Sequence, residues 1–350
     1  YKRQETFNAS TWISPMPRAH LALLVDAVAG AGARTIGMDV YLDLLWPTLN
    51  EIDQGDDLLR EAIERAGNVV LVTPMQRTDS GYVSAPPHPF FSEVAAAVGT
   101  AELPASYETF RDATLLVRTA DGLAPSFALA MYAHARGLDL DSLLAETEAQ
   151  GRVDLPGLPE AVGTLPESWS SPSAALDDPI LPFRIHYVGP PSGTLESDPP
   201  GTFSTPGSSI ADVVAMLTPE TFQDKIVLLG TGFHSEDRFR TPFYGYEVVT
   251  EPGAPSERYE WMYGVEIHAN ALQNIIDGAY VSRLPAVLVL LLLLGGAALT
   301  AGTVFVRGAA WGAAASFAAI AATWSVAYWV WAGVVYLSLI HISEPTRPPS

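Results

Sequence analysis

The feature that most restricts the fold of this chain is an uncharged, apolar run of 23 residues from Leu284 to Val306. At about 1.5 Å of rise per residue, a helix of this length crosses a hydrocarbon core of roughly 30 Å. Globular helices seldom run this far without a polar face, because one side of them normally meets water. The run therefore predicts a transmembrane helix over 284–306.

Apolar sequence resumes after Arg307 and Gly308 and continues to Ile340. We interpret it as a second span over 309–331, with aromatic residues near the membrane interface, and the start of a truncated third span over 332–340. Arginines flank the first span on both sides, so charge alone does not orient it. Residues 341–350 are polar and proline-rich, and we expect them to be a non-native tail.

Acidic residues are concentrated ahead of the apolar end. Of the 39 Asp and Glu residues in the 350-residue chain, 38 precede Leu284, together with 17 of the 19 Lys and Arg residues, and the formal net charge is −20. Only two lysines, Lys2 and Lys225, are present, so we expect no nucleic-acid partner. The absence of cysteine excludes disulfides, thiolate metal sites and cysteine nucleophiles.

The acidic part alternates between helix and strand patterns. Helices are predicted over 18–33, around Leu59 and Ile63, over 209–217 and over 264–277, and strands over 35–41, 68–73, 183–188 and 225–230. The continuous apolar run at 225–230 is typical of a central strand that is covered on both faces. We therefore expect an α/β fold, with a mainly parallel sheet and helices on both faces, followed by an all-α transmembrane anchor.

The middle of the chain is less regular. Residues 114–118, a turn at Asp121 and Gly122, and a helix over 126–136 predict a hairpin-like insertion. The acidic stretch 139–178 is rich in Pro, Ser and Gly, and we interpret it as a surface insertion of low order.

Several stretches of the sequence resemble the second class of CHASE domains, which are extracytoplasmic sensors. The opening match runs from Trp12 to Asp39, and the middle one comprises Tyr187 to Pro190 and Ser209 to Val213. The closing match comprises Lys225 to Gly230, Asp237 to Pro242 and Tyr263 to Leu272. The resemblance implies that residues 1–283 form a sensor domain whose first strand and preceding membrane helix are missing.

The resemblance also implies a function. In that family the sensor is followed by membrane helices and a cytoplasmic output domain, which is a nucleotide cyclase, a diguanylate cyclase or a protein kinase. We therefore expect a multi-pass receptor of a bacterial inner membrane, with residues 1–283 outside the cytoplasm and the output domain missing. The expected partners are an unknown small-molecule or envelope ligand, the membrane, and a second copy joined through the receptor helices. No enzyme activity is expected in the chain itself.

Candidate ligand-binding residues follow from the rule that open α/β sheets bind ligands at the carboxyl ends of their strands. The candidates are Asp39, Gly230, Gly232, Asp237, Arg238 and Thr241. Each also has a structural interpretation: the glycines can form a tight turn, and Asp237 with Arg238 can order a loop. The glycines lack the remainder of a GxGxxG or Walker motif, so they give little support for phosphate binding.

The helix expected over 264–277 is the candidate signal-transmitting element, because only six residues separate its last residue from the first span. It carries Gly264, Glu266, His268 and Asn270 of the closing match, and its predicted polar face holds Glu266, Asn270, Gln273 and Asp277. His234, Glu236, Glu266 and His268 lack the spacing of a zinc motif, so a core histidine is the stronger interpretation of His268. No metal, cofactor or catalytic residue is expected.

Two other functions remain open. One is a membrane-tethered periplasmic enzyme that uses the edge with Asp39 and Asp237. The other is a structural envelope module without a ligand.

Overall fold

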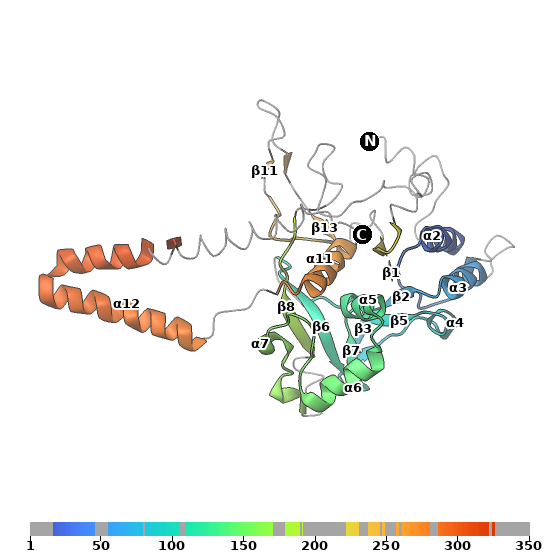
Figure 1. Ribbon diagram of the computed structural model, residues 1–350, viewed down its shortest axis with the longest axis horizontal. Coiled ribbons are helices and arrows are strands. Elements are labelled where there is room, and N and C mark those ends of the chain that lie inside the picture. Colours follow the sequence, from blue (N-terminus) through green and yellow to red (C-terminus); the bar gives the residue numbers. More distant parts are fainter. Residues whose placement is uncertain are drawn as a thin grey trace, which may run out of the picture. The chain divides into compact units, whose positions relative to one another are not determined.

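A computed structural model describes most of the acidic part of the chain and much of the apolar end (Figure 1). The described residues are 17–45, 55–79, 81–104, 109–170, 179–189, 191, 222–230, 237–245, 247–248, 257–258, 261–280, 286–321 and 324–325. The predicted helix over 209–217 and the regions 332–340 and 341–350 lie outside these residues. The chain divides after Ser282 into two units, Tyr1–Ser282 and Arg283–Ser350.

A four-stranded sheet organises the first unit. Its strand order is β5-β2-β1-β9, and every neighbouring pair is parallel. The strands are β1 (Thr35–Asp39), β2 (Val69–Thr73), β5 (Ala97–Thr100) and β9 (Ile226–Gly230). The three predicted runs at 35–41, 68–73 and 225–230 are therefore all strands of one parallel sheet.

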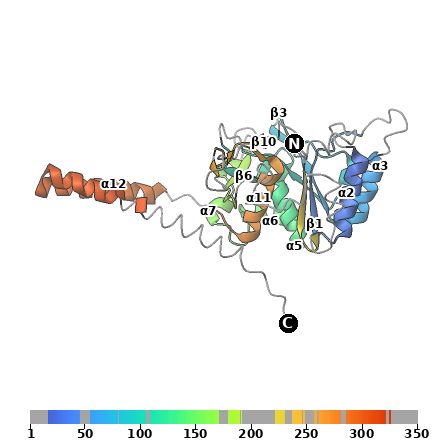
Figure 2. The same ribbon diagram turned by 90° about the horizontal axis from the view of Figure 1, so that it is seen from above.

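Helices cover both faces of this sheet, which confirms the predicted α/β class. Figure 2 shows α2 (Arg18–Gly30) and α3 (Gly55–Ala66) on one side, and α5 (Phe127–Arg136) and α11 (Gly264–Asp277) on the other. Each face has its own apolar core. Val25, Ile36 and Ile63 are fully buried beneath α2 and α3, and Val70, Met131 and Ile267 are fully buried beneath α5 and α11.

Local sequence signals explain where α5 begins and ends. The Ser126 hydroxyl oxygen accepts a hydrogen bond from the Leu129 N–H at 3.1 Å, which caps the first turn. Gly137 ends the helix with φ of 66°, a left-handed conformation that favours glycine. The predicted helix over 126–136 is confirmed to within one residue.

Smaller antiparallel elements complete the first unit. A three-stranded sheet has the order β7-β6-β8, with β6 (Asp112–Thr119), β7 (Gly122–Pro125) and β8 (Ile180–Arg184). Two-stranded pairs are β3 (Met75–Thr78) with β4 (Gly81–Ser84), β10 (Arg238–Phe239) with β13 (Met262–Tyr263), and β11 (Glu247–Val248) with β12 (Glu257–Arg258). Further helices are α6 (Leu140–Gln150) and the short elements α4 (Pro89–Ser92), α7 (Glu160–Gly163) and η1 (Glu167–Ser170).

The prediction of low order over 139–178 was wrong for residues 139–170. Asp139 caps α6 through its side chain, which accepts from the Asp141 N–H at 3.2 Å, and Gly151 ends α6 in a left-handed conformation. Val153, Leu155 and Trp169 from this stretch are buried in the core beneath α5 and α11. The Pro, Ser and Gly residues there separate short elements, and the apolar residues between them anchor the stretch.

The prediction of a central, fully covered strand at 225–230 was correct in part. Alternate side chains of β9 pack against the two cores, with Ile226 and Leu228 on one face and Val227 and Leu229 on the other. Within the described residues, however, β9 pairs with β1 alone and its side chains are only partly buried. An apolar run indicates two covered faces and does not by itself indicate two strand neighbours.

The second unit contains α12 (Ala286–Arg307) and further helical residues over 309–321. Gly308, with φ of 92°, separates the two, and the Thr300 and Ser316 hydroxyl oxygens lie 3.1 Å apart. Among the residues that the structure describes, no helix meets the length and apolar character needed to cross a membrane. The spans predicted over 284–306 and 309–331 therefore stay predictions.

Candidate functional site

The carboxyl ends of β1 and β9 lie side by side at one edge of the sheet. Asp39, the last residue of β1, is in register with Gly230, the last residue of β9. Two of the residues predicted to bind a ligand are therefore neighbours at the edge where open α/β sheets place their binding sites. Gly232, another candidate, lies outside the described residues.

Three carboxyl groups at this edge lie close enough to the Tyr41 hydroxyl to raise its pKa. Partial burial of Tyr41, together with the nearby charges of Asp39, Asp237 and Glu102, raises the pKa of its hydroxyl to about 12. Asp39 is the last residue of β1, Glu102 follows β5, and Asp237 precedes β10. The edge is therefore an acidic site to which separate parts of the chain contribute.

Burial also makes the carboxyl groups harder to ionise. The pKa of Asp39 is raised to about 6 because the carboxylate loses water at the end of the strand. Burial raises the pKa of Glu102 in the same way. Near pH 6 Asp39 is consequently present both as a protonated carboxyl group that donates a hydrogen bond and as a carboxylate that accepts one.

Asp237 connects this edge to the start of α11. Its carbonyl oxygen accepts a hydrogen bond from the Gly264 N–H at 3.2 Å. Its carboxylate lies so close to Gly264 that a β-carbon at position 264 would overlap it. The amino end of a helix carries partial positive charge, which favours a carboxylate at this position.

Gly230 is needed at its position for a packing reason. A β-carbon there would lie 2.6 Å from the β-carbon of Val265, in the first turn of α11. The predicted residues Asp237 and Gly230 therefore both lie against the amino end of α11, at Gly264 and Val265. The candidate ligand site is therefore in direct contact with the candidate transmitting helix.

The other two loop candidates have different environments. Arg238 is exposed, donates a hydrogen bond to the Tyr263 hydroxyl at 2.8 Å, and holds its guanidinium 4.9 Å from the centre of that ring. It thus links β10 to β13. Thr241 is only 1% exposed, and its hydroxyl oxygen has no hydrogen-bond partner within the described part of the chain. A buried hydroxyl in this state is costly unless water or a ligand satisfies it.

The helix α11 matches the predicted range 264–277, and Gly278 ends it with φ of 62°. Its predicted polar face is buried at Glu266 and Asn270, which are 7% and 0% exposed. The Asn270 side-chain oxygen accepts from the Val188 N–H at 3.1 Å. Asn270 is therefore a buried polar residue that links α11 to the segment containing Val188.

Asn274 makes a second link of the same kind, one turn further along α11. Its amide accepts from the His186 N–H at 2.6 Å and donates to the His186 carbonyl oxygen at 2.8 Å. The side chain pairs with both backbone groups of one residue, as a neighbouring strand would. Together with Asn270, it fixes α11 to the segment that follows β8.

His268 lies in the core, as its stronger interpretation predicted. Its ring meets the Phe127 ring edge to face, with the centroids 5.5 Å apart, and burial lowers its pKa to about 4. It is therefore neutral at neutral pH. No group of three His, Cys, Asp or Glu side chains within the described residues is arranged to hold a metal ion, and His234 and Glu236 lie outside those residues.

Three residues at the site were not predicted from the sequence: Tyr41, Glu102 and Asn274. Glu102 follows β5, whose sequence Ala-Val-Gly-Thr is too short and too small in side-chain volume to stand out as a strand. The edge rule would have identified Glu102 once β5 was known. Asn274 follows Asn270 by four residues, so the two lie on one face of α11, and that spacing was the available signal.

A comparison with protein-family models identifies one match, the CHASE2 domain, over residues 4–303. No curated protein and no solved structure matches the chain. The family match covers β1, β9 and α11, the elements that form the site.

Proposed function

The chain belongs to the CHASE2 domain family of extracellular sensory domains, and from this membership we propose that it is the ligand-sensing part of a bacterial transmembrane receptor. Its ligand binds at the carboxyl edge of the sheet, among Asp39, Glu102 and Asp237. The acidic groups favour a small molecule or envelope component that presents N–H or O–H donors or a positive charge. We propose no catalytic residue and no enzyme activity for this chain.

One observation carries the proposal: Asp237 faces the ligand edge and also contacts the first residue of α11. A ligand that pairs with Asp237 changes the group that supports the amino end of this helix. If the helix has two arrangements, a ligand shifts their populations only by its difference in affinity for the two. Asn270 and Asn274 then determine how rigidly α11 carries the change along its length.

We further propose that the chain continues from α11 into a membrane anchor with spans over 284–306 and 309–331. The uncharged sequence of 284–306 supports this proposal, as do the apolar side chains that α12 exposes, which include Leu291, Leu293 and Phe305 at 60%, 67% and 92%. The receptor is then a multi-pass protein of the inner membrane that pairs with a second copy through its helices. Its output domain is a nucleotide cyclase, a diguanylate cyclase or a protein kinase.

An insertion after Ser282 tests the proposed transmission. Several flexible residues at this point lengthen the link between α11 and the first span, so a movement of α11 no longer reaches the span. We expect the full-length receptor to lose regulation of its output and to keep its basal activity. The same insertion in the turn at Asp121 and Gly122 is the control. Unchanged regulation after the Ser282 insertion would contradict the proposal.

Asp237→Ala separates the sensor from the membrane-tethered enzyme. We expect this variant to change the output of the full-length receptor, because α11 loses the carboxylate at its amino end. Asp26→Ala is the control, since Asp26 pairs with Arg65 on the exposed side of α2 and α3. Loss of turnover of a soluble substrate, with the receptor output unchanged, would favour the enzyme.

A further inference from the structure

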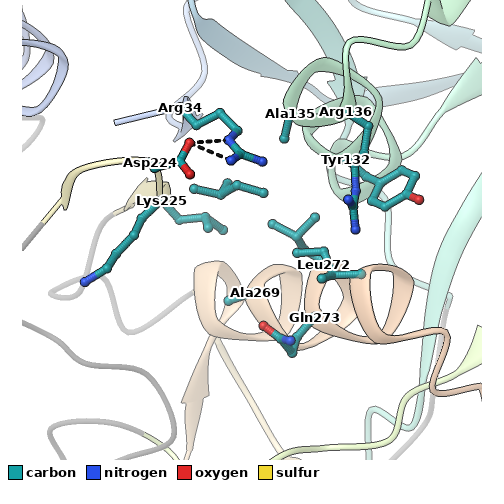
Figure 3. Close-up of a pocket in the computed structure, with 12 residues that line it drawn as sticks. Arg34, Tyr132, Ala135, Arg136, Asp224, Lys225, Ala269, Leu272 and Gln273 are labelled. Atoms are coloured by element: carbon teal, nitrogen blue, oxygen red, sulfur yellow. Dashed lines mark hydrogen bonds and ion pairs between the residues drawn. The ribbon is translucent and has the colours of Figure 1, made fainter. Parts of the chain in front are cut away.

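A cavity of about 400 Å³ lies at the opposite edge of the sheet from Asp39, between α5, α11 and β9 (Figure 3). Arg34, which lines it, immediately precedes β1, and Asp224 and Lys225, which also line it, immediately precede β9. Because the strands are parallel, these residues mark the amino ends of the strands. The cavity is therefore separate from the carboxyl edge described above.

The cavity has an apolar floor and a basic rim. The floor consists of small and aliphatic side chains from β9 and α11, namely Ile226, Leu228, Ala269, Leu272 and Ile276. Three basic residues, Arg34, Arg136 and Lys225, line it together with a single acidic residue, Asp224. In a chain that carries 39 acidic and 19 basic residues, this local excess of positive charge is unusual.

The single acidic residue of the cavity lining, Asp224, forms an ion pair with Arg34. The Asp224 carboxylate accepts hydrogen bonds from Nε and Nη2 of Arg34 at 2.7 and 2.6 Å. The backbone holds Asp224 in place as well, because its N–H donates to the Gly32 carbonyl oxygen at 2.8 Å. Asp224 therefore neutralises Arg34 in part and leaves the other guanidinium N–H groups of Arg34 available as donors.

Arg136 stands across the cavity from this pair. Figure 3 shows the Arg34 and Arg136 side chains reaching toward the cavity from opposite sides, whereas Lys225 extends away from it. The Arg136 guanidinium lies 5.7 Å from the centre of the Tyr132 ring, and no salt bridge to it occurs among the described residues. Its charge is thus oriented by an aromatic ring and lacks an anionic partner there.

We propose that this cavity binds a small organic anion, a carboxylate with a short apolar body. Arg136 holds the carboxylate, with Arg34 opposite, because a guanidinium presents paired N–H donors that match a carboxylate. The apolar body covers the floor between β9 and α11. The volume lies within the range of about 300 to 1,000 Å³ that is usual for small-molecule sites. This inference concerns binding alone and does not rest on the proposed receptor function.

Calorimetric titration of the whole chain in detergent micelles tests the proposal, with empty micelles as the blank. The probe is hexanoate, and hexanamide is its uncharged counterpart with the same apolar body. We expect saturable binding of hexanoate with one site per chain. Hexanamide is expected to bind at least about tenfold more weakly, because it lacks the charge that strengthens hydrogen bonds to arginine.

Two variants assign the binding to the cavity. Arg136→Gln removes the charge and is expected to weaken hexanoate binding by about tenfold to a hundredfold. Arg65→Gln is its matched control, because Arg65 pairs with Asp26 elsewhere on the surface, and it should leave the affinity unchanged. Ala269→Leu places a larger side chain of α11 in the cavity floor and should abolish hexanoate binding. If this variant does not fold, the affinity of Arg136→Gln still tests whether hexanoate binds in the cavity.

Several results would overturn the proposal. Absence of saturation with hexanoate excludes the site, and equal affinity for hexanamide excludes recognition of an anion. Inorganic phosphate that binds as tightly as hexanoate shows that the apolar floor contributes nothing. If Arg136→Gln lowers the melting temperature but leaves the affinity unchanged, Arg136 only compensates the carboxyl end of the α5 dipole.

Discussion

Asp39 illustrates how one residue changes character between sequence and fold. In the sequence it is an acidic residue at the end of an apolar run, and in the fold it is in register with Gly230 at the sheet edge. Burial raises its pKa to about 6. Ionising Asp39 in the folded protein therefore costs free energy, and pKa shifts of this kind are typical of binding sites.

Asp39→Asn tests this electrostatic cost. Because the pKa of Asp39 is higher in the folded protein than in the unfolded chain, the folded protein binds more protons between about pH 4 and pH 6. Stability therefore falls as the pH rises through this window. Asparagine does not titrate, so the stability of the variant lacks this fall. The free energy of unfolding of the variant minus that of the parent should therefore be about 2 kcal/mol larger at pH 7.5 than at pH 4.

Thermal unfolding of both proteins at pH 4 and pH 7.5 provides the measurement. Asp26→Asn is the control, since Asp26 lies on the surface in a pair with Arg65. If the stability difference between Asp39→Asn and the parent does not change with pH, the pKa of Asp39 is the same in the folded protein as in the unfolded chain.

At the scale of the element, α11 depends on two asparagines for its position. Asn274→Ala leaves the N–H and carbonyl groups of His186 without their partner in a partly buried place. We expect a loss of about 2 to 4 kcal/mol in the free energy of unfolding, measured with chemical denaturant. Gln273→Ala, next to it and only partly buried, should change that energy by less than about 0.5 kcal/mol. Equal losses would show that the helix, and not the amide, is responsible.

The approach of α5 to the sheet depends on Gly99 in β5. A β-carbon at Gly99 would lie 2.7 Å from the Cα of Phe127 and 2.8 Å from its N, and these backbone atoms cannot rotate away. Gly99→Ala should therefore cost about 1 to 3 kcal/mol in denaturant unfolding. Gly30→Ala, at the end of α2 with open space around it, should instead gain up to about 1 kcal/mol. A neutral result at Gly99 would mean that α5 can shift outward without loss.

These elements also show what the sequence can and cannot predict. Strands β1, β2 and β9 follow from short apolar runs, and helix α11 follows from its apolar periodicity and from Gly278, which ends it, so their ranges were predicted closely. Strand β5 was missed, because Ala-Val-Gly-Thr has little local preference for a strand and takes its place in the sheet through pairing with β2. Glu102 was missed with it. The contact of Asp237 with Gly264 spans 27 positions and depends on tertiary packing, which no local pattern encodes.

At the scale of the whole molecule, charge is the dominant long-range term. The chain carries a formal net charge of −20, and 38 of its acidic residues precede Leu284. Like charges at this density repel one another and oppose the compact state. The exposed ion pairs Arg65 with Asp26 and Arg118 with Glu148 offset little of this, because surface pairs are worth about 0 to 1 kcal/mol each.

Salt should therefore stabilise the folded protein. At 0.01 M ionic strength charges interact over roughly 30 Å, and at 0.15 M over roughly 8 Å, so added salt screens the repulsion across the sheet and its helices. We expect the melting temperature at pH 7.5 to rise by several degrees between about 20 and 300 mM NaCl. At pH 4, where part of the carboxylates are protonated, the rise should be smaller. A melting temperature that falls with salt at pH 7.5 would show that attractive ion pairs outweigh the net charge.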